Sequence, residues 1–306
     1  MKLFKITGAP LNNGRAKKHR GIHSAVFLLL VFIACCSICS GQQNMPAGRE
    51  LTPATGYYKQ LAALGSKPAS ANEESDKKKF PYDSAWANKV LSVKPYYLKN
   101  TSVDDFKLPA PPANSSEQTR AELNYLLALQ DSRTSEDIRS SLYMSNEPQS
   151  PSDVGRSLGL WATPQSLPLT DSLMEHLTLD GDYFLWALKF KYARVRPYVL
   201  EPKLHDLEES RASSYPSGHV TYAYIKAYIY QELAPEFTAF FLKNAYDMSH
   251  ARQLIGVHYP SDCEGSRIFA RQLVNMLLQN ERFRKELEEV KKEWAQKEKE
   301  SFDSTK

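Results

Sequence analysis

Three short motifs in the second half of the chain combine cationic side chains, histidines and a carboxylate. Each motif alone is a weak signal. A lysine and an arginine on a helix are usually solvated, a Ser-Gly pair before a helix is usually a cap, and a lone histidine is usually a packed residue. Chance seldom produces their order and spacing together. The motifs are Lys189-x6-Arg196-Pro197, Tyr215-Pro216-Ser217-Gly218-His219 and Arg252-x5-His258-x3-Asp262.

The residue types in these motifs suit the transfer of a phosphoryl group. Three cations can neutralise a dianionic oxyanion, and the two arginines add forked, bidentate contacts. Two histidines can serve as nucleophile and acid near neutral pH, and one carboxylate can orient an imidazole. Phosphoryl transfer depends mainly on positioning and on stabilising the charge of the equatorial oxygens. We therefore expect a phosphotransfer site if the three motifs converge in space.

The elements around the motifs predict how these side chains are placed. Lys189 and Arg196 are seven residues apart, so one helix would project both from the same face. The turn at Ser217 leads directly into a helix. The Ser217 hydroxyl and the N–H groups of Gly218 and His219 can hold an anion at its positive end. The third motif is expected to run across a helix end, a loop and the start of the next helix.

Helical periodicity dominates the second half of the chain, whereas alternating strand patterns are scarce. Proline must end the first-motif helix near Pro197, Gly256 falls near a later helix end, and Ser261 with Glu264 matches a capping box. We therefore expect an all-α fold with a single helical-bundle domain. Helices are expected at about 117–130, from about 182 to near 197, from about 217, from about 235 to near 256, from about 261 to 279, and in a last segment with Phe283, Leu287, Val290 and Trp294 on one stripe.

The N-terminal residues have the layout of an export segment. Basic residues precede an apolar run from Ala25 to Cys39, which is short for a spanning helix. A signal peptide is the favoured interpretation, and an anchor helix or lipid attachment at Cys35 or Cys36 is the alternative. We expect a periplasmic or secreted protein, with or without a lipid anchor. Its expected parts are a signal or lipid-anchor segment at 1–41, a flexible polar linker at 42–89, the helical domain at 90–298 and a disordered tail at 299–306.

Charge, apolar runs and cysteine content exclude several binding partners and a disulfide framework. The net charge of +4 comes from 39 basic and 35 acidic residues, without the concentrated basic stripe typical of nucleic-acid binding. No later segment of the sequence is apolar over enough residues to span a bilayer. Three of the four cysteines lie in the export segment, so we expect no disulfide framework and a small buried thiol at Cys263.

The three motifs in this order resemble the signature of one superfamily. It contains type 2 phosphatidic acid phosphatases, bacterial class A non-specific acid phosphatases and vanadium haloperoxidases. The likeness is greatest to the class A acid phosphatases and covers residues 95–295. It includes the segments YYLKNTSVDDFKLPAPPANSS, KYARVRPY, SSYPSGH, GVHYPSD and QNERFRKELEEVKKEW. The resemblance implies a helical fold of the acid phosphatase and vanadium haloperoxidase type.

Carried over position by position, the resemblance implies an acid phosphatase that hydrolyses a broad range of small phosphomonoesters and can transfer phosphate to alcohols. His258 would attack phosphorus and form a phosphohistidine, while Asp262 holds the other nitrogen of its ring. His219 would protonate the leaving alcohol and then activate water. No cofactor and no metal are implied, and a homo-oligomer is compatible with the resemblance. The implied phosphate ligands are Lys189, Arg196, Arg252, Ser217 and the backbone N–H groups of Gly218 and His219.

The sequence departs from the family pattern at Ala251, where a serine is usual. We expect weaker anion binding rather than loss of activity. The loop at 146–158 lacks the Gly-rich character expected near the substrate pocket, which leaves substrate preference open. His250 has no carboxylate at matching spacing and is a poor candidate for the nucleophile. The alternatives are a vanadium-dependent haloperoxidase, which shares the oxyanion cradle, and a non-catalytic helical module that binds phosphate.

Overall fold

The computed structural model describes residues 73–146 and 165–303 of the 306-residue chain. All of these lie in one compact unit, Tyr57–Lys306, while the other unit, Met1–Gly56, lies outside the described residues. The predicted export segment, the first part of the predicted linker and most of the loop at 146–158 therefore also lie outside them. The described ranges are helical and contain no strand, which confirms the all-α prediction. No helix in these ranges has the length and apolar character needed to span a bilayer.

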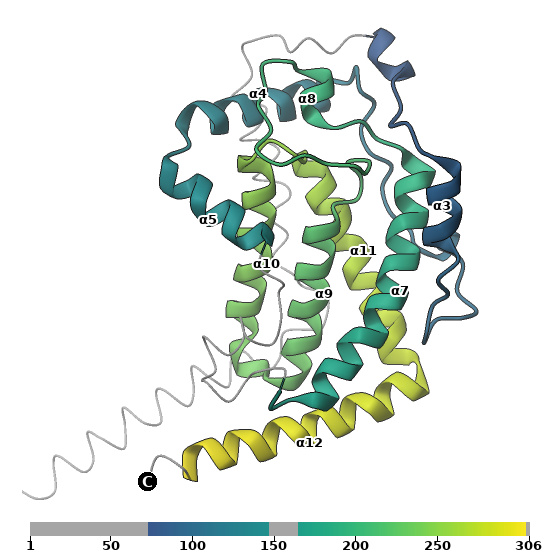
Figure 1. The fold of residues 1–306 in the computed structure, drawn as a ribbon, viewed down its shortest axis with the longest axis vertical. Helices are drawn as coiled ribbons and strands as arrows, with labels where there is room; N and C mark the ends of the chain where they lie inside the picture. The colour runs from purple at the N-terminus through teal and green to yellow at the C-terminus, as the bar shows by residue number, and fades with distance from the viewer. Residues whose placement is uncertain (1–72, 147–164, 304–306) are drawn as a thin grey trace, which may run out of the picture. The chain divides into compact units, whose positions relative to one another are not determined.

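The predicted helices correspond to α4, α7 and α9–α12, whereas α3 and α5 were not expected. Helix α7 begins well before the predicted start, and α12 continues into the predicted disordered tail. The α-helices are α3 (Ser84–Leu91), α4 (Glu117–Ser132), α5 (Ser135–Asn146), α7 (Pro168–Tyr192), α8 (Pro197–Leu200), α9 (Gly218–Leu233), α10 (Thr238–Leu254), α11 (Pro260–Gln279) and α12 (Glu281–Asp303), and the 3₁₀-helices are η1 (Glu73–Lys77), η2 (Val103–Asp105) and η3 (Pro235–Phe237) (Figure 1).

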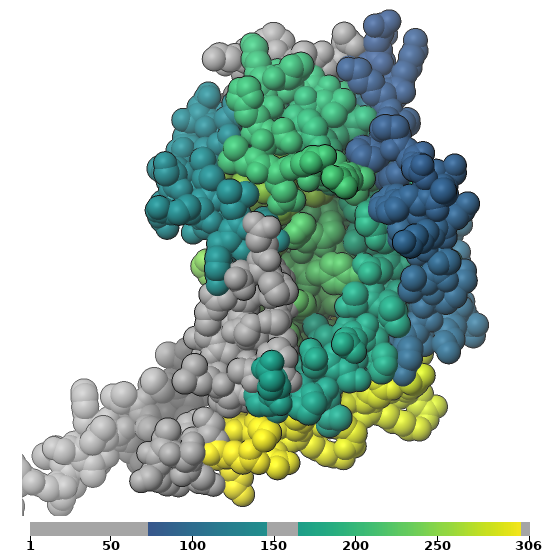
Figure 2. Space-filling view, viewed as in Figure 1, coloured from purple at the N-terminus to yellow at the C-terminus, as the bar shows by residue number. Residues whose placement is uncertain are grey.

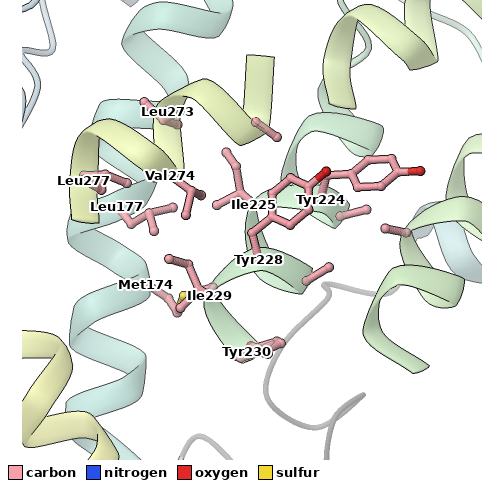
Figure 3. Close-up of a cluster of buried hydrophobic side chains, with 14 of the residues drawn as sticks. Met174, Leu177, Tyr224, Ile225, Tyr228, Ile229, Tyr230, Leu273, Val274 and Leu277 are labelled. Carbon is pink, nitrogen blue, oxygen red and sulfur yellow. The ribbon is translucent and has the colours of Figure 1, made fainter. Parts of the chain in front are cut away.

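Helix α9 lies at the centre of the hydrophobic core. It packs most extensively against α10 and α11, and α7 lies beside it (Figure 1). Apolar side chains surround α9, as expected for a helix that is buried on most of its surface. Burial of each large apolar side chain stabilises the folded state by about 1.5–3 kcal/mol. The packing of these helices therefore fixes the positions of the elements around the site. Side chains that meet in this core include Met174 and Leu177 of α7, Tyr224, Ile225, Tyr228, Ile229 and Tyr230 of α9, and Leu273, Val274 and Leu277 of α11 (Figure 3).

Helix α12 caps the N-terminus of α7. The carboxylate of Glu293 accepts hydrogen bonds from the N–H groups of Leu169 and Thr170 at 2.8 and 2.9 Å. These donors have no acceptor within their own helix, so the contact satisfies them. Trp294 Nε1 donates to the Thr170 hydroxyl at 2.8 Å. The predicted apolar stripe of α12 is confirmed, since Phe283, Leu287, Val290 and Trp294 are all buried.

The turn between α10 and α11 positions the third motif. Helix α10 ends at Leu254, close to the predicted end, and Gly256 follows with a φ of +79°. Glycine adopts this left-handed conformation without a steric cost. Pro260 begins α11, a position where its missing N–H costs nothing.

The predicted capping box of Ser261 with Glu264 is wrong. The Asp262 carboxylate accepts from the Tyr259 N–H at 2.9 Å and closes the first turn of α11. Glu264 instead forms a bidentate ion pair with Arg267 on the same helix. The cap is thus two residues before the predicted pair, and it uses a residue of the third motif.

The described part of the predicted linker is folded against α7. Residues 73–89 contain η1 and most of α3. The Tyr82 hydroxyl donates to the Lys189 carbonyl at 2.9 Å, and the rings of Trp86 and Trp186 meet edge-to-face with centroids 4.7 Å apart. These aromatic contacts therefore hold the segment against α7, although a highly polar run precedes it. The helical domain begins before residue 90.

Candidate active site

The three motifs meet around one cavity of about 450 Å³. It lies between α7, α9 and α10, at the end where α9 begins, and α5 and the segment between α8 and α9 complete its lining (Figure 1). That segment forms the surface over this end of the helices (Figure 2). The motif residues that line the cavity are Lys189, Arg196, Gly218, His219, Arg252 and His258.

Lys189 and Arg196 are not on one helix, contrary to the prediction. Helix α7 ends at Tyr192 because Ala193 takes a left-handed conformation, with a φ of 43°. Arg196 is extended, as the residue before a proline prefers to be, and Pro197 begins α8. Both side chains nevertheless line the cavity.

Backbone carbonyls of the α8–α9 segment hold these two cations. Lys189 Nζ donates to the Ser213 carbonyl at 2.7 Å, and Arg196 Nε donates to the Ala212 carbonyl at 2.9 Å. Burial, together with the nearby arginines, lowers the pKa of Lys189 well below its usual value. Burial also lowers the pKa of Arg196 to about 10. An anion in the cavity would favour the charged form of both groups.

His258 is held as a neutral imidazole with a defined tautomer. Its Nε2 lies 2.9 Å from Arg196 Nη1, and its Nδ1 lies 3.2 Å from Asp262 Oδ2. A guanidinium can only donate, so Nε2 carries the lone pair and Nδ1–H donates to the carboxylate. Burial and then Arg196 lower the pKa of His258 well below its usual value, although Asp262 opposes them. The geometry thus presents an unprotonated nitrogen beside a cation.

Asp262 is a buried carboxylate with several donors. Its Oδ2 accepts from the Ser214 hydroxyl at 2.5 Å and the Tyr259 N–H at 2.9 Å, besides the His258 ring. Its Oδ1 accepts from Arg194 Nη1 at 2.7 Å. Burial alone would raise the pKa of Asp262, but Arg194 and these hydrogen bonds hold it well below its usual value. These contacts therefore favour the ionised form of the group.

Arg194 and Glu122 support the site, and neither belongs to the three motifs. Arg194 Nη2 lies 3.3 Å from Glu122 Oε2, and Glu122 Oε1 accepts from the Ser261 N–H at 2.8 Å. Both charged side chains are shielded from water. Glu122 lies on the buried face of α4 with Leu123 and Leu126. An acidic residue on that apolar face is a signal that could have identified it.

The second motif starts α9 with free donors. The Ser217 N–H donates to the Ser266 hydroxyl at 2.7 Å. The Ser217 hydroxyl is itself buried, and no partner for it occurs in the described residues. The N–H groups of Gly218 and His219 lie in the first helical turn, where the helix supplies no acceptor. This end of α9 is thus suited to an anion.

A close contact fixes the turn before Ser217. The ring of Tyr215 lies against Gly265 of α11, so a Cβ at this glycine would overlap the ring. The Tyr215 hydroxyl donates to the Pro109 carbonyl at 2.6 Å. Only glycine allows α11 to approach this closely.

His219 is partly enclosed and hydrogen-bonded on one nitrogen. Its Nε2 lies 3.1 Å from the carbonyl of Ser145 at the end of α5. A carbonyl can only accept, so Nε2 carries the hydrogen and Nδ1 remains for another partner. Burial and then Arg252 lower the pKa of His219 to about 4, against the opposing charge of Glu208.

Arg252 is engaged by Glu208, a residue that the motifs do not contain. Its Nη1 and Nη2 each lie 2.6 Å from a carboxylate oxygen of Glu208, and Nη1 also donates to the Ser145 hydroxyl at 2.7 Å. Arg252 Nε is buried without a partner in the described ranges. Glu208 lies in a charged stretch without periodicity, so no sequence pattern pointed to it.

The remaining candidates fall outside the cavity. Ala251 is buried, and Ser249 does not replace the missing hydroxyl, because its own hydroxyl donates to the Ala245 carbonyl at 3.0 Å. His250 is exposed on α10. Cys263 is a buried free thiol, as expected.

Comparisons with known proteins find sequence relatives among the acid phosphatases. No family model matches the chain. It is 29% identical over 225 residues to a non-specific acid phosphatase of Providencia stuartii, across 67% of this chain and 88% of that protein. It is 26% identical over 216 residues to a non-specific acid phosphatase of Salmonella typhimurium, across 66% of this chain and 84% of that protein.

Among solved structures, a transmembrane PAP2 type phosphatidylglycerolphosphate phosphatase from Bacillus subtilis matches 52% of this chain and 83% of its own, with 18% identity and a TM-score of 0.39. The curated sequence relatives match over more than four-fifths of their length, so their similarity extends well beyond the short motifs. The chain is therefore a homologue of the non-specific acid phosphatases.

Proposed function

We propose that the protein hydrolyses phosphomonoesters through a phosphohistidine on His258. The contact of 2.9 Å between His258 Nε2 and Arg196 Nη1 carries the proposal. It places the attacking lone pair beside a cation that can bind the phosphate oxygens. Asp262 on the opposite ring nitrogen stabilises this tautomer and the cationic ring that forms on phosphorylation. Homology to the acid phosphatases supports the same reaction class.

The reaction proceeds in two steps that exchange the role of His219. In the first step, His258 Nε2 bonds to phosphorus, the bond from phosphorus to the ester oxygen breaks, and protonated His219 gives its proton to that oxygen. In the second step, His219 takes a proton from water while the water oxygen bonds to phosphorus. The bond from phosphorus to nitrogen then breaks and returns the lone pair to Nε2. The products are an alcohol and inorganic phosphate.

The charges around the cavity suit a dianion. Lys189, Arg196 and Arg252 all line it. The buried Ser217 hydroxyl and Arg252 Nε, which have no partner in the described residues, are further donors. A hydrogen bond to a charged group is worth about 1.5–3 kcal/mol. These donors can therefore stabilise the charge on the equatorial oxygens in the transition state without a metal.

The cavity wall supports a broad substrate range. Leu185 and Trp186 of α7 and Met248 of α10 present apolar surface beside the cations. Apolar contacts discriminate weakly between leaving groups of similar size. An alcohol that takes the place of water in the second step would accept the phosphate, which gives phosphotransfer.

Trapping the covalent intermediate tests the proposal. Rapid quenching with labelled p-nitrophenyl phosphate should yield a phosphoenzyme that is labile in acid and stable in base, as a phosphoramidate is. His258→Ala should lose the label and the release of p-nitrophenol while the protein stays folded, as its circular dichroism spectrum would show. His250→Ala, on exposed α10 surface, is the matched control and should keep both. A chelator should not change the rate.

Two outcomes would contradict different parts of the proposal. Substantial turnover by His258→Ala would remove the nucleophile assignment and leave the phosphatase activity intact. A folded wild-type protein that neither releases p-nitrophenol nor acquires the label would remove the activity itself.

We also propose that the chain is exported before it acts. The support is the basic flank and the apolar run up to Cys39. Protein recovered from the periplasm or the medium should begin beyond this run. A lipid-modified cysteine at Cys35 or Cys36 would identify the anchored form, and an intact N-terminus on exported protein would contradict processing.

A further inference from the structure

The segment between α8 and α9 supplies internal acceptors to the three motif cations that line the cavity, Lys189, Arg196 and Arg252. These acceptors take hydrogen bonds from the same side chains that, in the proposed function, bind the phosphate oxygens. Two are backbone carbonyls, and the third is a carboxylate, the only charged one of the three. The pairs are Ser213 O with Lys189 Nζ at 2.7 Å, Ala212 O with Arg196 Nε at 2.9 Å, and the Glu208 carboxylate with both Nη atoms of Arg252 at 2.6 Å.

The ion pair of Glu208 with Arg252 is asymmetric. The Arg252 side chain is 2% exposed, whereas that of Glu208 is 29% exposed. Arg252 is also fixed by its contact with the Ser145 hydroxyl. The arginine therefore stays in the cavity, and the glutamate is the partner that can turn toward water.

The backbone next to Glu208 is anchored. The Leu207 N–H donates to the Ile255 carbonyl at 3.0 Å, and Leu207 packs with the buried side chains of Ile255 and Val257. Rotation of the Glu208 side chain is thus enough to free Arg252. No rearrangement of the anchored residue before it is needed.

A carboxylate and a phosphate cannot both accept hydrogen bonds from the same edge of a guanidinium. Both are anions that accept from Nη1 and Nη2 in a bidentate manner. Both would also lie beside His219, whose charge state responds to Glu208. The two anions are therefore alternatives at the Nη1–Nη2 edge of Arg252.

We propose that Glu208 is an internal competitor for phosphate, which must leave Arg252 before a substrate binds there and whose return displaces the product. The inference rests on the proposed function and names a residue that sets the affinity of the same site. It predicts weaker binding of both substrate and inorganic phosphate than the three cations alone would give. It also predicts faster release of phosphate.

Glu208→Gln tests the competition with little change in shape. The amide keeps the size of the side chain but removes the charge that competes with phosphate. Inorganic phosphate, titrated by calorimetry, should bind about tenfold more tightly, as when a charge-assisted hydrogen bond becomes a neutral one. Product inhibition of p-nitrophenyl phosphate turnover should strengthen in parallel. Glu208→Ala, which removes the acceptor altogether, should also bind phosphate more tightly.

Glu209→Gln is the matched control. It removes the same unit charge at the next residue, where the side chain is 82% exposed and contacts only exposed Arg211 among the described ion pairs. Its phosphate affinity should equal that of the wild type. Equal or weaker phosphate binding by both Glu208 variants, in folded protein, would overturn the inference. Turnover of p-nitrophenyl phosphate by the wild type is measured separately. Its absence would contradict the proposed function, whereas the phosphate affinities of the variants decide whether Glu208 competes with phosphate.

Discussion

Arg194 Nη1 lies 2.7 Å from Asp262 Oδ1, and water reaches neither side chain. This ion pair lies at the Nδ1 side of His258, whereas Arg196, a proposed phosphate ligand, lies at Nε2. It connects the chain after α7 to the first turn of α11. Glu122 of α4 is a second carboxylate on Arg194, with its Oε2 3.3 Å from Nη2. The orientation of the proposed nucleophile thus depends on a buried pair that does not itself line the cavity.

Arg194→Met should destabilise the protein strongly. Removal of the guanidinium leaves the Asp262 and Glu122 carboxylates buried without a cation, which typically costs about 3–5 kcal/mol. The pKa of Asp262 should rise, because Arg194 is the main group that lowers it. Urea unfolding measures the loss, and Arg211→Met, at an exposed position, is the control. A change below about 1 kcal/mol would mean that the pair is not maintained in solution.

The activity should fall as the pH rises. His219 must begin the proposed reaction protonated, and burial with Arg252 lowers its pKa to about 4. Above that value the protonated fraction of the free protein drops about tenfold per pH unit. For an ester with a poor leaving group, kcat/KM should therefore decline from mildly acidic pH upwards. A bound dianion raises the pKa of His219, so kcat should persist to higher pH than kcat/KM.

His219→Ala separates the acid role from a role in binding. The variant should lose far more activity on alkyl phosphates than on p-nitrophenyl phosphate, because p-nitrophenolate leaves without a proton. The loss on the alkyl esters should be about 10²–10⁴-fold. An equal loss on both substrates, or an optimum above about pH 9 for the wild type, would argue against a protonated His219.

The motif residues that line the cavity were predictable because their motif spacing is strict, whereas the residues that contact and position them were not. Lys189 and Arg196 line the cavity as expected, yet the single helix predicted for them ends at Tyr192. The cause is the left-handed conformation of Ala193. Alanine rarely adopts this conformation, and no residue pattern predicts it.

The segments missed by sequence reasoning share a physical cause. Helix α3 follows a highly charged run, so the aromatic contacts of Trp86 with α7 were not anticipated. Glu208 gains its importance only from the packing of the α8–α9 segment over Arg252. Long-range contacts of this kind have no local periodicity. The helices α10 and α12 were found because their apolar residues recur at helical spacing along the chain.

Gly265→Ala should disturb the second motif from a distance. The added Cβ would overlap the ring of Tyr215, which lies two residues before Ser217. Overpacking of this type costs about 1–3 kcal/mol, and here it should also displace the donors at the start of α9. Urea unfolding and KM for p-nitrophenyl phosphate should both report the change. In a Tyr215→Ala background the same substitution should cost much less; an equal cost in both backgrounds would mean that the clash is not with this ring.

Ala251→Ser restores the hydroxyl that the resemblance leads one to expect before Arg252. One added hydrogen bond to the anion or to Arg252 should tighten phosphate binding about three- to tenfold. Ser249→Ala is the matched control. It removes a hydroxyl two residues earlier that is bound to the Ala245 carbonyl, so phosphate affinity should not change. Position 251 is 2% exposed, and a hydroxyl without a partner there would be destabilising. Tighter binding without a loss of unfolding free energy would therefore mean that the hydroxyl has found a partner in the site. Unchanged binding with lower stability would mean that the packing around α10 has closed this position to the phosphate.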